Sequence, residues 1–346
     1  MYGNGMAADV PDPRDIAAHA EWLAHRYDPI GDAVQFVQVT RQEHRAATFL
    51  TDAELGPRAP VVLSRGQALA GTGPAAPLHF IFHSAFCCST LVARAFDLPG
   101  HAMGLKEPTI LNDLVGWRQR GAEPRQLAAA LDAALTLLAR PFGAGEAIVI
   151  KPSNVVNMLA PAIMAMRPDA RALLLHAPLP VYLGSIARKG MEGRLWVRDL
   201  LVKQARDGAV RFNFGAEDLL ALTDLQAAAV GWLNQQALFA DLTERLGGRI
   251  RTADSERLLA EPRAAMAALF AHFDMELAPE ALGRVVSGPA FTRNSKRAGE
   301  AFDSDARAAE QQRDRLFADE VDKVAVWAAA VAERFGVPMQ LPRSLS

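Results

Sequence analysis

The most informative segment of the chain is Phe80-Ile81-Phe82-His83-Ser84-Ala85-Phe86-Cys87-Cys88-Ser89-Thr90-Leu91-Val92. An apolar run ends in small polar residues and then resumes as an amphipathic helix, which predicts a strand, a phosphate-binding loop and a helix. Backbone N–H groups of such a loop and of the first helical turn point at one spot, where the helix dipole also favours an anion. The alternative is a tight turn in which Ser89 or Thr90 only caps the helix.

The loop departs from the Walker pattern of nucleotide hydrolases, G-x-x-x-x-G-K-[ST]. If Thr90 takes the last position, the two glycines and the lysine are replaced by His83, Cys88 and Ser89. We therefore do not expect an ordinary ATP or GTP hydrolase.

Composition narrows the class of protein. The chain has 346 residues, half of them hydrophobic, and a net charge of -2, so it is long enough for one large domain or two and has no global basic field for nucleic acid or an anionic membrane. Neither a signal sequence nor an apolar run of about 18 to 20 residues is present, which predicts a cytoplasmic protein without a membrane span. Its two cysteines, Cys87 and Cys88, are neighbours, so we expect neither a disulfide nor structural zinc.

Apolar patterning predicts an α/β fold with a P-loop-like, doubly wound and mainly parallel sheet flanked by helices. We expect a small N-terminal α/β extension over residues 1–75 and the P-loop-like domain, with a helical C-terminal part, over residues 76–346. In the extension, a helix is expected over 14–27 and a strand over 34–39, and the best linker is 71–77. Further strands are expected at 147–150, 172–176 and 249–252, and helices near 124–140, 155–166, 221–246, 262–273 and 305–335.

Ligands of a doubly wound sheet lie beyond the carboxyl ends of its strands, which directs attention to residues that follow strands. Proline bars helix continuation through Glu107 in Leu105-Lys106-Glu107-Pro108, and it favours an extended glutamate at a strand end. A carboxylate near a phosphate loop can act as a general base, although a solvated charge pair beside a turn explains the motif equally well. Lys151 directly ends a buried strand, where its charge can stabilise a bridging or leaving oxygen.

A fourth motif follows the strand at 172–176. If a helix runs through residues 181–189, Ser185 and Arg188 share one face and can meet one anion. Solvation on a helix surface is the alternative for Arg188.

Together these motifs and their order resemble the sulfotransferase family over roughly residues 78–275. Lys151, Pro168-Asp169-Ala170-Arg171 and Ser185 look like the bacterial members' K-S-P, F-P-D-A-R and downstream serine. The segment Thr252-Ala253-Asp254-Ser255-Glu256-Arg257-Leu258-Leu259-Ala260-Glu261-Pro262 looks like their Y-E-D-L element and the proline after it. The resemblance implies a P-loop-like fold that transfers a sulfuryl group from 3'-phosphoadenosine 5'-phosphosulfate to a hydroxyl or amine of a small-molecule or peptide acceptor, with no metal.

The resemblance also implies roles for residues. Glu107 would be the base, and Lys151 and Lys106 would neutralise charge on the transferring group. The loop would hold the 5'-phosphosulfate and Ser185 the 3'-phosphate. The donor-binding residues expected on these grounds are Ser84, Cys87, Cys88, Ser89, Thr90, Ser185, Arg188, Arg293 and Lys296.

Three positions depart from the family pattern. Phe86 stands where bacterial members carry arginine, Cys88 stands where they carry glycine, and Ala177 or one of its neighbours lies at the place of their 3'-phosphate arginine. Two alternatives therefore stay open: a nucleotide-dependent phosphotransferase, and a non-catalytic nucleotide-binding protein with a degenerate sulfotransferase fold.

Overall fold

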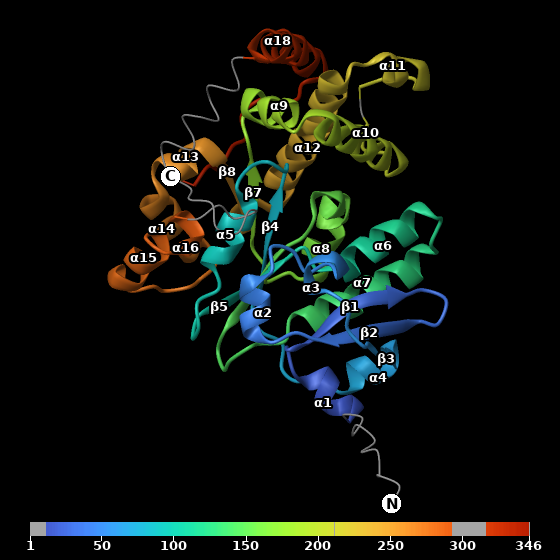
Figure 1. The fold of residues 1–346 in the computed structure, drawn as a ribbon, viewed down its shortest axis with the longest axis vertical. Helices are drawn as coiled ribbons and strands as arrows, with labels where there is room; N and C mark the ends of the chain where they lie inside the picture. The colour runs from blue at the N-terminus through green and yellow to red at the C-terminus, as the bar shows by residue number, and fades with distance from the viewer. Residues whose placement is uncertain (1–11, 211, 293–315, 346) are drawn as a thin grey trace, which may run out of the picture.

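A five-stranded parallel sheet forms the centre of the molecule (Figure 1), with the strand order β5-β6-β4-β7-β8. The computed structural model describes residues 12–210, 212–292 and 316–345. The strands of this sheet are β4 (Leu78–His83), β5 (Ala102–Lys106), β6 (Ala147–Lys151), β7 (Ala172–His176) and β8 (Ile250–Asp254). Every neighbouring pair is parallel, which confirms the expected α/β fold class.

The four strands other than the edge strand β8 are buried along their whole length, because helices cover both faces of the sheet. Side chains alternate between the faces, so that Phe80 and Phe82 of β4 join one apolar cluster while Ile81 joins the other. The continuous apolar runs in the sequence are explained by this burial on both sides.

One face packs against helices α6 (Thr109–Gln119), α7 (Pro124–Leu138) and α8 (Ala160–Met166), the last preceded by the 3-10 turn η1 (Asn154–Leu159). The apolar cluster on the other face includes α5 (Ser89–Ala95), α9 (Leu179–Arg188) and α14 (Pro262–His272). The same cluster extends to α10 (Gly190–Arg206) and α18 (Ala318–Phe335), which pack on α9 and α12. The long helix α12 (Asp224–Leu246) contributes to both clusters. Shorter elements are α11 (Ala216–Ala221), η2 (Gly247–Arg249), α13 (Ser255–Ala260), α15 (Pro279–Val286) and α16 (Pro289–Thr292).

The expected strands and helices of the central domain are found within a few residues of their predicted bounds. The helix expected over 305–335 corresponds to α18 from residue 318, and residues 305–315 lie outside the described residues. None of the described helices is long and apolar enough to cross a membrane.

The N-terminal extension forms an antiparallel sheet of β1 (Trp22–Asp28), β2 (Ala33–Gln38) and β3 (Val61–Ser64). Its helices are α1 (Pro13–Ala18), α2 (Arg41–Ala46), α3 (Asp52–Leu55) and α4 (Arg65–Ala70). The helix expected over 14–27 is wrong in its second half, because residues from Trp22 onward pair with β2 and that pairing outweighs their helical spacing. The strand over 34–39 is confirmed as β2, and 71–77 joins α4 to β4 without an element of its own.

The extension packs closely on the central sheet. Its apolar residues, among them Ile16, Val34 and Phe36, belong to the same cluster as Phe80 and Ile150. The buried guanidinium of Arg140, at the end of α7, donates to four backbone carbonyls of the extension, those of Ile16, Ala17, His19 and Trp22. A shared core therefore holds the extension against one face of the sheet, and the boundary at 75/76 stays a prediction.

The C-terminal segment returns to the outer edge of the sheet. Thr252 of β8 donates its N–H to the carbonyl of Arg343 at 3.0 Å and accepts from the N–H of Leu345 at 2.8 Å. The Thr252 hydroxyl also donates to the carbonyl of Pro342 at 2.8 Å. Residues 342–345 thus cover the exposed edge of β8, where unpaired backbone groups would otherwise remain.

Candidate functional site

The carboxyl ends of β4, β5 and β6 meet at one edge of the sheet, because all three strands are parallel. Lys106 and Lys151 are register partners at the ends of β5 and β6. The next residue, Glu107, donates its N–H to the carbonyl of Lys151 at 2.7 Å. This bond fixes the acidic residue beside the end of β6.

Glu107 has a backbone φ of 55°, so the expected extended conformation is wrong. A left-handed conformation is uncommon for a residue with a side chain and is disfavoured before proline. The hydrogen bond to Lys151 holds the backbone in this turn, which aims the carboxylate at the lysine. Such strain is tolerated where neighbouring contacts fix the residue, and it clusters at functional sites.

Lys151 is the centre of the site. Its ammonium, only 1% exposed, forms an ion pair with Oε1 of Glu107 and donates to Oγ1 of Thr90 at 3.5 Å. It also lies 4.9 Å from the ring centre of Phe49, which comes from the N-terminal extension. One buried cation therefore connects the acidic residue, the first turn of α5 and an aromatic wall.

His83 belongs to the same cluster, although the sequence reasoning left it out of the site. Its Nδ1 accepts from the N–H of Ala85 at 3.0 Å, so the ring proton lies on Nε2, which donates to the carbonyl of Pro152 at 3.0 Å. Nε2 lies 4.0 Å from Oε1 of Glu107. Its position at the end of β4 was the available signal.

The loop between β4 and α5 has an unusual backbone. Ala85, Phe86 and Cys88 have φ values of 71°, 51° and 58°, in the left-handed region that glycine favours. The family pattern has glycine at the position of Cys88, so this chain adopts a glycine-like loop without the glycine. Such conformations cost of order 1–3 kcal/mol each and persist only where the surroundings impose them.

The loop residues predicted from the sequence fall into two groups: side chains engaged in the interior, and residues at the start of α5. Ser84 is fully buried; its hydroxyl accepts from the N–H of Ala177 at 3.2 Å and so ties the loop to the end of β7. Cys87 is buried with its thiol 3.5 Å from the carbonyl of Leu175. Cys88 is half-buried at the start of α5, where Ser89 and Thr90 follow. The hydroxyl of Thr90 contacts the Lys151 ammonium.

Lys106 lies beside this cluster with its ammonium directed elsewhere. Its side chain, also 1% exposed, donates to the carbonyl oxygens of His44 and Arg45 at the end of α2. Burial lowers the pKa of Lys106 to about 7. The same burial, with the nearby Lys106 charge, lowers the pKa of His44 to about 3.

A second group of predicted residues lies on α9. The guanidinium of Arg188 donates to the hydroxyl of Ser185 at 3.0 Å, and that hydroxyl donates to the carbonyl of Val181 at 2.9 Å. The expected pairing of Ser185 and Arg188 on one helix face is therefore confirmed. The two other residues predicted to bind the donor, Arg293 and Lys296, lie outside the described residues.

Phe86 links the loop to this second group. Its ring makes edge contacts with Tyr182 of α9 and Trp196 of α10, with ring centres 5.8 Å and 5.3 Å apart. The ammonium of Lys189 lies 6.0 Å from its centre. Phe86 is thus packed in an aromatic cluster with a lysine over its face.

Among the described residues, no group of three or more histidine, cysteine, aspartate or glutamate side chains could hold a metal ion. The site instead offers lysine, hydroxyl, imidazole and carboxylate groups. These can bind an anion and exchange a proton with a neighbouring group.

Comparison with known proteins gives matches at the level of solved structures. No family model and no curated protein matches the chain. The structure is similar to sulfotransferase STF9 from Mycobacterium avium, with 14% identity, a TM-score of 0.41, and coverage of 72% of this chain and 77% of that one. It is also similar to sulfotransferase STF1 from Mycobacterium tuberculosis H37Rv, with 14% identity, a TM-score of 0.39, and coverage of 62% and 72%. A third similar structure is the sulfotransferase domain of the Synechococcus PCC 7002 olefin synthase, with 15% identity, a TM-score of 0.38, and coverage of 64% and 81%. All three are sulfotransferases, the family that the sequence motifs resemble.

Proposed function

We propose that the chain is a sulfotransferase that moves a sulfuryl group from 3'-phosphoadenosine 5'-phosphosulfate to a hydroxyl or amine of a small-molecule or peptide acceptor. The observation that carries this proposal is the position of Lys151, whose ammonium contacts both the Glu107 carboxylate and the Thr90 hydroxyl. A proton acceptor, a cation and the loop thus converge at one point.

The residues of the site suit an in-line transfer. The acceptor oxygen or nitrogen forms a bond to sulfur while the bond from sulfur to the bridging oxygen breaks, and the electron pair of that bond leaves with the nucleotide. Glu107 takes the acceptor proton, and Lys151 stabilises the charge that develops on the bridging oxygen. Nε2 of His83 lies 4.0 Å from the Glu107 carboxylate, but its proton is donated to the carbonyl of Pro152, so the imidazole borders the carboxylate without a hydrogen bond to it.

The donor's two anionic ends have separate candidate partners. The hydroxyls of Ser89 and Thr90, with the loop backbone, are suited to the 5'-phosphosulfate. Ser185 and Arg188, already joined by a hydrogen bond at 3.0 Å, are suited to the 3'-phosphate, because a guanidinium and a hydroxyl both donate to phosphate oxygens. Cys87 and Ser84 contribute through the position of the backbone, since their side chains are engaged in the interior.

A non-catalytic nucleotide-binding protein is the second candidate. It is favoured by one observation: the ion pair of Lys151 with Glu107 occupies the two groups that the reaction needs. Turnover requires that the donor draw the lysine toward its bridging oxygen and leave the carboxylate for the acceptor. A phosphotransferase is supported only by the presence of the loop.

Calorimetric titration with 3'-phosphoadenosine 5'-phosphate, against ATP and ADP with and without Mg²⁺, separates these functions. We expect metal-independent preference for the bisphosphate, and loss of that binding by about tenfold or more in Lys151→Met, since hydrogen bonds to charged groups contribute roughly 1.5–3 kcal/mol. The matched control is Lys323→Met on α18, whose side chain is 75% exposed. A preference for ATP with Mg²⁺ would favour a phosphotransferase, and no binding of the bisphosphate would contradict the proposal.

Turnover is tested separately by incubating the protein with the labelled donor and a panel of phenols, alcohols and amines. Sulfuryl transfer to any of them supports the enzyme. Tight bisphosphate binding without transfer to any acceptor would favour the non-catalytic protein.

A further inference from the structure

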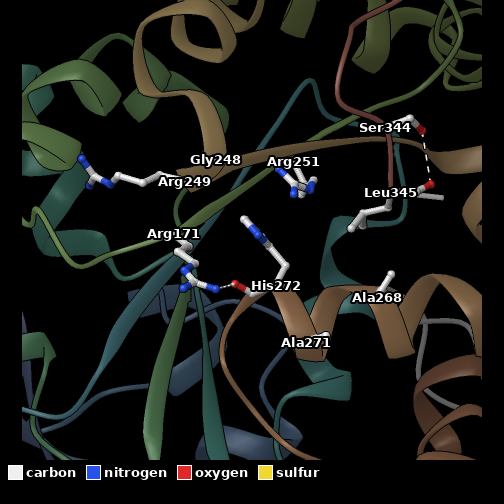
Figure 2. Close-up of a pocket in the computed structure, with 9 residues that line it drawn as sticks. All are labelled: Arg171, Gly248, Arg249, Arg251, Ala268, Ala271, His272, Ser344 and Leu345. Carbon is white, nitrogen blue, oxygen red and sulfur yellow. Dashed lines mark hydrogen bonds between the residues drawn. The ribbon is translucent and has the colours of Figure 1, made fainter.

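A pocket of about 580 Å³ opens at the amino ends of β7 and β8 (Figure 2). Basic side chains dominate its lining, namely Arg171, Arg249, Arg251 and His272, and apolar walls come from α14 and from Leu345 of the C-terminal segment. Its volume lies in the range of pockets that hold small organic ligands. It is larger than a single phosphate requires.

This pocket lies away from the candidate site described above. Arg171 directly precedes β7, whereas His176 ends that strand on the side of the phosphate loop. Five residues of strand span about 16 Å, and the two openings lie at opposite edges of the sheet. Ligand binding here neither uses nor depends on Lys151 and Glu107.

Arg249 has a structural role in the wall of the pocket. Its guanidinium donates to the carbonyl oxygens of Met164, Arg167 and Ala170, at distances of 2.7 to 3.0 Å. It therefore closes the carboxyl end of α8, and its N–H groups are largely occupied.

The guanidinium of Arg171 is partly available to a ligand in the pocket. Its guanidinium donates to the carbonyl of His272 and pairs with the exposed carboxylate of Asp274, each at 2.6 to 2.7 Å. These contacts fix the guanidinium at the rim and offset part of its charge.

Arg251 differs from both. Within the part of the chain that the structure describes, its guanidinium donates to the carbonyl of its neighbour Ile250, at 3.0 Å, and forms no ion pair. Figure 2 shows the Arg171 and Arg251 guanidinium groups on either side of the His272 side chain. Nε2 of His272 lies 3.2 Å from the carbonyl of Ala172, which holds the ring at the amino end of β7.

We propose that this pocket binds a small organic phosphate, with Arg251 as the principal contact and Arg171 as the second. A guanidinium presents its N–H groups as a planar fork that matches two phosphate oxygens, and a partly buried arginine without an acidic partner is satisfied by such an anion. The methyl groups of Ala268 and Ala271, together with Leu345, provide an apolar wall for the rest of the ligand. The proposal stands whether or not the chain transfers sulfuryl groups.

Site-resolved arginine modification tests the proposal on the unaltered protein. The full chain is treated with phenylglyoxal in the presence and absence of inorganic pyrophosphate, and each arginine is quantified by peptide mass spectrometry. We expect Arg251 to react and pyrophosphate to protect it, while the exposed Arg206 on α10 reacts equally in both samples. An unreactive Arg251, or equal reaction with and without pyrophosphate, would overturn the proposal.

A variant measures the contribution of the guanidinium. Arg251→Gln, made in a Lys151→Met background to weaken the phosphate-loop site, should bind pyrophosphate about tenfold or more weakly than that background alone. Arg206→Gln in the same background is the matched control and should leave the affinity unchanged. Equal pyrophosphate affinity in a folded Arg251→Gln protein would count against the proposal, with the melting temperature showing that the variant folds.

Discussion

Lys106 and Lys151 lie side by side at the ends of two neighbouring strands, are register partners, and are each 1% exposed. Their surroundings differ. Lys106 donates to backbone carbonyls at the end of α2, whereas Lys151 contacts the side chains of Glu107 and Thr90. Lys106 therefore joins the N-terminal extension to the sheet, whereas Lys151 connects a carboxylate and a hydroxyl of the candidate site. The same residue type at the same kind of position has two roles, decided by what packs against it.

The largest effect is expected at Glu107. Its carboxylate contacts Lys151 and gives the Lys151 region a proton acceptor, which distinguishes it from the Lys106 region. Glu107→Gln keeps the shape but removes the base, so kcat for sulfuryl transfer should fall by about 10² to 10⁴-fold while bisphosphate affinity changes little. Steady-state kinetics and calorimetry check both quantities. Glu280→Gln, at an exposed position of α15, is the control. Retained turnover in Glu107→Gln would remove the base from the proposal.

The second prediction compares the separate replacement of each lysine by methionine. Lys106→Met should lower the free energy of unfolding by about 1–3 kcal/mol, because carbonyl oxygens of α2 lose a buried donor, and should leave bisphosphate affinity within about twofold of the wild type. Lys151→Met should show the opposite pattern, with weaker binding as the main effect. Denaturant unfolding and calorimetry on both variants give the result. If Lys106→Met weakened binding as much as Lys151→Met, the two regions would not be separate.

The third prediction concerns how the stability contributed by Lys106 depends on pH. Burial lowers the pKa of Lys106 from its ordinary value to about 7, so between pH 7 and pH 10 the unfolded state binds more protons at this position than the folded state. Stability contributed by this group therefore rises with pH across that window. The stability difference between the wild type and Lys106→Met should shift in favour of the wild type from pH 7 to pH 10, measured by unfolding at each pH. A difference that stayed constant with pH would mean that Lys106 titrates normally.

The smallest effect concerns the aromatic neighbours of the two regions. Phe49 lies 4.9 Å from the Lys151 ammonium, so Phe49→Leu should reduce kcat by about two- to fivefold, as expected for loss of a modest cation–π contact that positions the lysine. Phe142 packs edge-on against His44, with ring centres 5.0 Å apart, on the Lys106 side. Phe142→Leu should lower the melting temperature and leave kcat unchanged. Equal kcat values for Phe49→Leu and the wild type would show that the ring does not position Lys151.

Much of the central domain is predictable from the sequence, because strands buried on both faces require continuous apolar runs. The extension is harder to predict: Trp22 and Leu23 have helical spacing relative to Ile16, yet they lie in β1, since pairing with β2 outweighs local preference. In the site, Glu107, Lys151 and Thr90 follow from their places after strands. Phe49 has no sequence signal, because it reaches Lys151 from a segment about a hundred residues earlier in the chain.

The parallel sheet, the loop after β4 and the set of polar residues at strand ends can be predicted from the order of residues alone, because apolar periodicity and short-range turn chemistry are local properties. The folded molecule is needed to see which buried lysine contacts Glu107 and which loop residues adopt positive φ. It is also needed to see that Arg171, Arg251 and His272 line one pocket. These depend on how distant segments pack, and the energy of a charged side chain is set by the groups around it. Identical residue types therefore acquired different roles from their surroundings.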